Sequence, residues 1–80
     1  MQLPVVERRA LFLVDVARGY GQSNKDDEAL HALLTAEQLA HEEVRYSPAA
    51  RTLVAQLLHR ERAGRNADLR ALAERVGAVA

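Results

Sequence analysis

Residues 13–41 read LVDVARGYGQSNKDDEALHALLTAEQLAH, and this stretch decides the fold. Two segments with the apolar spacing of helices flank a polar break at residues 21–24, Gly-Gln-Ser-Asn. Small residues recur in both segments at Ala17, Ala29 and Ala36, where two helices would cross. Alanine at a crossing lets two helix backbones approach closely. The spacing therefore predicts a helical hairpin.

Large residues are interleaved with these alanines, and we expect Leu13, Tyr20 and Leu33 to fill the wedge beside them. This alternation of small and large residues has the register of a tetratricopeptide repeat. A hairpin of that kind binds and positions other molecules. The pattern therefore favours a binding function over a catalytic one.

The first helix of the hairpin is expected to begin at Pro4, because proline is favoured at a first helical position. It is expected to end near Arg18, with Gly19 and Gly21 breaking it. These limits place the first helix almost wholly before the polar break.

The second helix of the hairpin is expected to begin after Ser23 or Asn24, either of which could cap it. Acidic residues 26–28 would then occupy its first turn, where carboxylates favour the positive end of the helix dipole. Asn24 also tolerates the left-handed backbone conformation that a tight turn requires. The helix is expected to run to about Ala40.

Residues 41–46 are expected to form a polar connection to a third helix. Ser47 as N-cap and Pro48 at the first helical position give a strong start signal, and the helix is expected to end near Arg62 or Ala63. Its apolar stripe has a period of about 3.6 residues and comprises Ala50, Leu53, Val54, Leu57 and Leu58.

A fourth helix is expected to be capped by Asn66 and to stop at Gly77. No segment alternates with a period of two over a useful length, so no sheet is expected. The sequence therefore predicts one all-α domain, residues 1–80, with four helices. A tetratricopeptide-like hairpin at about 4–40 precedes a second, capping helix pair at about 47–77.

The first helix carries more apolar surface than one neighbouring helix can cover. We expect the surplus to form an interface through Val5, Leu11, Phe12 and Val16. A chain of 80 residues is only marginally stable alone, which also favours a partner. The expected partner is a second copy of the chain, in a homo-oligomer, or a DNA-binding domain in cis.

The charge is distributed unevenly along the chain. Residues 1–44 carry four basic and eight acidic side chains, a net charge of −4, whereas residues 45–80 carry seven arginines and three acidic side chains, a net charge of +4. These charges could form solvated faces of amphipathic helices, with some pairs across the fold, or they could join two copies or attach this chain to another domain. Direct nucleic-acid binding is disfavoured because no aromatic residues are interleaved with the arginines to stack bases.

Candidate catalytic and metal-binding residues have simpler interpretations. Ser23 and Ser47 fall at helix starts, where capping accounts for them. The nearest metal candidate, His41-Glu42-Glu43, has one imidazole and two adjacent carboxylates, and the chain has no cysteine. We therefore expect no enzyme activity, no metal and no cofactor.

The longest apolar run, residues 10–14, is far shorter than the roughly 20 residues that a membrane span needs. No cleavage site of a signal peptide follows it. The sequence therefore predicts a soluble, cytoplasmic protein without a membrane partner.

The pattern as a whole resembles the C-terminal helical region of actinobacterial helix-turn-helix regulators of the xenobiotic-response-element type. The resemblance covers nearly all 80 residues and is carried by Leu3-Pro4, Glu7-Arg8, residues 12–18, Asp27-Glu28-Ala29-Leu30, Leu33-Leu34, Ala36-Glu37, residues 42–45, Leu53-Val54, Leu57-Leu58 and residues 69–73. His41 departs from the proline usual in the linker of that family.

This resemblance implies a dimerisation or regulatory domain of a transcriptional regulator. The DNA-reading helix-turn-helix that precedes this region in such regulators is absent from these 80 residues, so no DNA contact is transferred to them. Two alternatives remain open from the sequence: a domain that senses a small molecule or a peptide, and an independent adaptor protein.

Overall fold

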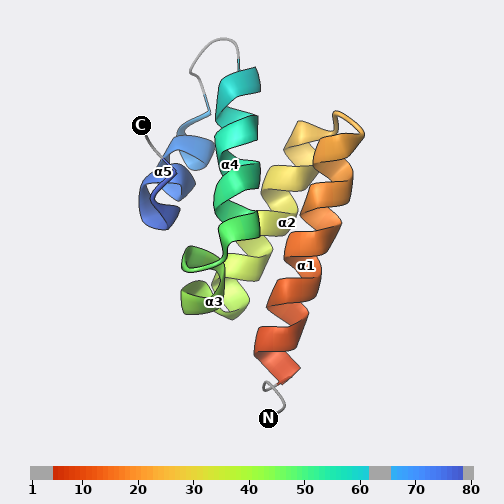
Figure 1. Ribbon diagram of the computed structural model, residues 1–80, viewed down its shortest axis with the longest axis vertical. Coiled ribbons are helices and arrows are strands. Elements are labelled where there is room, and N and C mark those ends of the chain that lie inside the picture. The colour runs from red at the N-terminus through yellow and green to blue at the C-terminus, as the bar shows by residue number, and fades with distance from the viewer. Residues whose placement is uncertain (1–4, 62–65, 79–80) are drawn as a thin grey trace.

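A computed structural model describes residues 5–61 and 66–78 of the chain (Figure 1). All regular structure in these residues is helical, which confirms the all-α class. The helices are α1 (Val5–Gln22), α2 (Asp26–Leu39), α3 (His41–Arg45), α4 (Pro48–Arg60) and α5 (Ala67–Val76). Pro4 and the predicted end of the third helix at residues 62–63 lie outside the described residues.

The hairpin of α1 and α2 has the most extensive contact between any two of these helices. Its crossing is built from alanines, as expected: Ala10, Ala17, Ala29 and Ala36 are completely buried. Because these side chains are short, the two backbones can pack closely along most of their length. α1 lies at one edge of the molecule and α5 at the other, with α4 between them (Figure 1).

The predicted end of the first helix near Arg18 is wrong, because α1 continues through Gly19 and Gly21 to Gln22. Gly21 is buried, and a Cβ atom placed on it would lie 2.8 Å from Leu53 Cδ1 of α4. The absent side chain therefore allows α1 to approach α4, and this glycine does not serve as a helix breaker.

The turn between α1 and α2 follows at residues 23–25. Asn24 has φ 59°, the left-handed conformation anticipated for it. The predicted N-cap at Ser23 or Asn24 is wrong, since Lys25 occupies that position and its side chain makes no capping hydrogen bond. The Asn24 side chain instead accepts a hydrogen bond from Arg60 at 3.1 Å. Because α1 is longer than predicted, the turn and the start of α2 move further along the chain.

The predicted polar connection at residues 41–46 contains the short helix α3. Val44 on this helix is completely buried, although its neighbours in sequence are polar. Burial of this one apolar side chain anchors the segment against the core, and the backbone N–H groups then find helical partners.

The helix starts predicted at Ser47 and Asn66 are confirmed. The Ser47 side chain accepts a hydrogen bond from the Ala50 N–H at 3.2 Å, with Pro48 beginning α4. The Asn66 side chain accepts from the Leu69 N–H at 3.1 Å at the start of α5.

The end predicted for the fourth helix is also confirmed. Gly77 follows Val76 in the left-handed conformation with φ 74°, and the Ala78 N–H reaches back to the Ala73 carbonyl at 2.8 Å. Ordinary capping chemistry therefore accounts for the limits of α5.

The core joins the hairpin to the second helix pair. Its largest completely enclosed side chains are Leu33, Leu57, Leu72, Val44 and Val54. Tyr20, expected to fill the wedge between the hairpin helices, is instead 37% exposed. Its ring lines a surface groove between α1 and α2, beside Asp27 and Glu28.

A matched pair of glycine variants tests the close approach of α1 to α4. A Cβ atom added to Gly19 would meet no other atom within 4 Å, so Gly19→Ala should gain only helix propensity and stabilise the fold by about 0.5–1 kcal/mol. Gly21→Ala gains the same propensity but must displace Leu53, which is 3% exposed, and should destabilise the fold by about 1 kcal/mol. Urea denaturation of the chain at a concentration low enough to keep single copies measures both free energies of unfolding. Equal stabilisation by the two variants would contradict this account.

Candidate functional site

The outward side of α1 carries a continuous stripe of exposed and half-buried side chains. We call it the α1 face, and it comprises Val5, Arg9, Phe12, Val16 and Tyr20. Spacings of three and four residues place these side chains on one side of a helix. Val5 and Phe12 are each 64% exposed, and Val16 is half-buried. The face is therefore an apolar surface that no described helix covers.

A groove borders the α1 face on the side of α2. Its volume is about 430 Å³, and its walls are formed by Leu13, Val16, Tyr20, Asp27, Glu28, His31, Ala32 and Thr35. The two carboxylates lie on the first turn of α2 and are exposed. The hairpin thus presents an apolar surface with acidic groups near Tyr20.

The structure brings together three of the four predicted interface residues. Val5, Phe12 and Val16 belong to the α1 face, but Leu11 does not. One residue corresponds to about 100° of rotation around a helix, which turns Leu11 away from the stripe. Leu11 itself is half-buried. The sequence predicted surplus apolar surface on this helix but did not separate the two sides of its broad apolar set.

Glu37 of α2 is a polar group within the core, with only 9% of its surface exposed. Both of its carboxylate oxygens accept hydrogen bonds at 2.7 Å from Arg75 of α5, one from Nε and one from Nη2. Arg45 of α3 lies nearby, with Nε 3.7 Å from Glu37 Oε2. One carboxylate therefore links three helices.

Hydrogen bonding to Glu37 raises the pKa of Arg75 above its usual value, although partial burial opposes this effect. Because the pKa is higher in the folded chain, the contribution of the charged Arg75 to stability is complete at neutral pH and is lost as the pH rises through strongly alkaline values. Glu37 was not singled out from the sequence. The one signal that could have found it was its spacing, four residues after buried Leu33 on the same side of α2.

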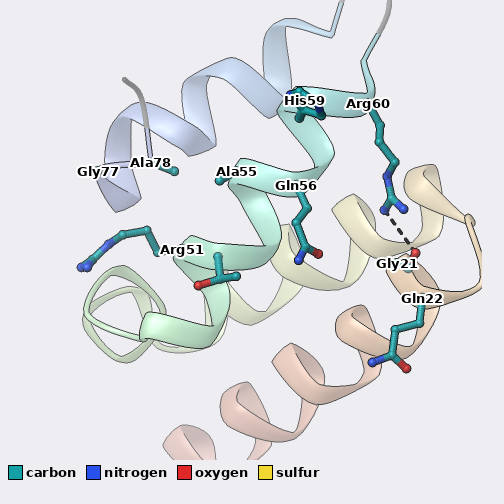
Figure 2. A pocket seen from close by; sticks show the side chains of 10 residues that line it. Gly21, Gln22, Arg51, Ala55, Gln56, His59, Arg60, Gly77 and Ala78 are labelled. Carbon is teal, nitrogen blue, oxygen red and sulfur yellow. Dashed lines mark hydrogen bonds between the residues drawn. The ribbon is translucent and has the colours of Figure 1, made fainter.

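A second arginine contact joins α4 to the tip of the hairpin. Arg60 donates to the Gly21 carbonyl at 3.1 Å and to the Asn24 side chain at 3.1 Å, and it also pairs with Asp26 at 2.9 Å (Figure 2 shows the bond to Gly21). Arg51 of α4 donates to the Val76 carbonyl at the end of α5, at 3.1 Å. Arginines from the basic half of the chain therefore hold the ends of other helices.

These contacts resolve part of the charge asymmetry. Arg45, Arg60 and Arg75 come from the basic half, and their carboxylate partners Glu37 and Asp26 come from the acidic half. The interpretation in which the halves pair within the fold therefore holds for these residues. Each pair has an arginine that is more than a third exposed, so solvent screens its electrostatic attraction.

A wide groove of about 790 Å³ lies over the exposed side of α4, between the end of α1 and the end of α5 (Figure 2). Its polar lining residues are Gln22, Arg51, Thr52, Gln56, His59 and Arg60. The described residues around it include no carboxylate. Because Arg60 and Arg51 already donate to protein oxygens, the groove combines neutral hydrogen-bonding groups with partly satisfied cations.

The candidate metal residues are not brought together. Within residues 5–61 and 66–78, no three His, Cys, Asp or Glu side chains form a group that could hold a metal ion. No helix in the same part of the chain is long and apolar enough to cross a membrane.

The chain matches no protein-family model, no curated protein and no solved structure. Among the surfaces described above, the α1 face is the one that exposes large apolar side chains in a continuous stripe.

Neutralising Glu37 tests the link between the hairpin and α5. Glu37→Gln keeps the shape of the side chain but removes the charge that faces Arg75 and Arg45, and we expect it to destabilise the fold by about 1–2 kcal/mol. The exposed residue Glu42 provides the control, because Glu42→Gln should change stability by less than about 0.5 kcal/mol. Thermal and urea denaturation measure the stability change of each variant. If both variants changed the free energy of unfolding equally, Glu37 would contribute no more to stability than an exposed carboxylate.

Proposed function

We propose that the protein is a non-enzymatic protein-interaction domain that associates with a second copy of itself through the α1 face. The observation that carries this proposal is the exposure of Val5 and Phe12, each 64%, on a helix at the edge of the molecule. Contiguous apolar patches on a small domain mark interaction surfaces. Covering this face removes apolar area from water, which favours association.

The chemistry of the face favours binding over catalysis. Its accessible groups are aliphatic and aromatic side chains with an arginine among them. Full burial of one large apolar side chain contributes about 1.5–3 kcal/mol. Association also costs translational and rotational freedom, so a few such side chains support a weak, concentration-dependent complex.

The resemblance to helix-turn-helix regulators supplies the biological context of the proposal. In a cytoplasmic transcriptional regulator, a dimerising helical domain would bring two DNA-reading domains together, as palindromic DNA half-sites require. The tetratricopeptide-like register of the hairpin fits this role, because stacked hairpins bury apolar faces against neighbours. A DNA-binding domain in cis would be the further partner.

Substitutions on the α1 face test the proposed function. Phe12→Ser and Val16→Ser remove apolar area from the face, and the wild-type chain should form dimers that these variants lose. Sedimentation equilibrium over a range of micromolar concentrations measures the change. Because Phe12 is 64% exposed in the single chain, Phe12→Ser should leave the helix content seen by circular dichroism unchanged.

Tyr46 provides the matched control for this experiment. It is 78% exposed, follows α3 and is not part of the α1 face, so Tyr46→Ser should leave the dimer intact. A wild-type chain that stays monomeric throughout the concentration range would refute self-association. Equal weakening by Tyr46→Ser would show that the α1 face is not the interface.

A further inference from the structure

Beside the α1 face, exposed side chains of opposite charge lie near its two ends. Arg8 and Arg9 are exposed near the start of α1. Asp27 and Glu28 are exposed at the other end, where they line the groove together with Tyr20. The apolar residues of the α1 face lie between a basic end and an acidic end.

This arrangement is self-complementary only for copies that run in opposite directions. A parallel pair would place Arg9 against Arg9 and acidic groups against acidic groups, which is unfavourable. An antiparallel pair places the basic end of each copy on the acidic end of the other. Antiparallel packing also opposes the dipoles of the two helices.

The apolar and charged contacts require the same symmetry axis. Arg9 and Tyr20 are separated by 11 residues, or about 16 Å along α1, and their midpoint lies between residues 14 and 15. The midpoint of Phe12 and Val16 is at residue 14, almost the same level. One two-fold axis there would place Phe12 near the partner's Val16 and Arg9 near the partner's Tyr20 and Glu28.

The missing side chain of Gly19 also fits this antiparallel arrangement. It is exposed, a Cβ atom added to it would meet no other atom within 4 Å, and it lacks the positive φ that would require glycine. An axis at residue 14 places Gly19 opposite the partner's Arg9. The absent side chain leaves space for the aliphatic part of that arginine, whose guanidinium could then reach the acidic groups of α2.

We propose that two copies pack their α1 faces antiparallel about this two-fold axis, with Arg9 of each copy meeting the partner's Glu28. This inference rests on the proposed function and adds the direction and register of the pair. The contact is isologous, as expected for a symmetric dimer.

The surface available on one copy is small for a stable dimer. An α1 helix of 18 residues is about 27 Å long, and two packed helices are about 20 Å wide. The hairpin therefore offers about 500 Å² per copy, below the roughly 800 Å² of a standard interface. The dimer should dissociate in the micromolar range and weaken with salt, because its charged contacts lie near solvent.

Exchanging the charges tests the direction of packing. In a homodimer of Arg9→Glu or of Glu28→Arg, both charged contacts become repulsive, and the dissociation constant should rise about tenfold or more. In an equimolar mixture of the two variants, both contacts become attractive again. Native mass spectrometry should therefore show more of the heterodimer than of either homodimer.

The control variants are Arg70→Glu and Glu74→Arg, which change exposed charges on α5 at the opposite edge. Each control variant alone, and an equimolar mixture of the two, should dimerise like the wild type. Dimers that survive the α1 and α2 exchanges, or a mixture that forms no preferred heterodimer, would overturn the antiparallel arrangement and leave self-association standing. A monomeric wild type would overturn the proposed function as well.

A cross-linking experiment checks the same contact without relying on charge. The chain has no cysteine, so single substitutions introduce the only thiols. A mixture of Arg9→Cys and Glu28→Cys should form a disulfide-linked heterodimer under mild oxidation, whereas Arg9→Cys alone should not cross-link. Preferential cross-linking of Arg9→Cys to itself would indicate a parallel pair and refute the proposal.

Discussion

The close approach of α1 to its neighbours is the constraint on which the rest of the structure depends. Completely buried alanines allow α1 to pack against α2, and Gly21 allows it to approach Leu53 of α4. Small residues on the buried side let the helix lie close to the core. Among the larger side chains of α1, Val14 packs within the core, whereas Phe12 and Val5 lie on the opposite side and remain exposed.

Charged contacts then fix the ends of the helices that apolar packing brings together. Arg60 binds the tip of the hairpin, Arg51 holds the end of α5, and Arg75 bonds to Glu37 inside the core. Because these arginines and their partners are far apart in sequence, the contacts form only in the assembled fold. The opposite net charges of the two halves of the chain therefore contribute to internal organisation as well as to the outer surface.

The proposed function follows from what this organisation leaves uncovered. α1 contributes to the core through one side and presents the other at the edge of the molecule, bordered by the acidic start of α2. A surface with an apolar centre and oppositely charged ends suits a second copy of the same chain, since two-fold symmetry satisfies both ends at once. In a regulator, such a pair would set the separation of two attached domains.

The sequence by itself determined the helical class, the alanine crossing, the caps at Ser47 and Asn66 and the stop at Gly77, because these depend on local spacing and on side chains that bond to nearby backbone. It also indicated that α1 has surplus apolar surface. Only the tertiary structure decided that α1 passes through Gly21, that buried Val44 anchors α3, that Glu37 bonds to Arg75, and which side of α1 is exposed. Each of these depends on a contact with a residue distant in sequence, and local periodicity carries no information about such partners.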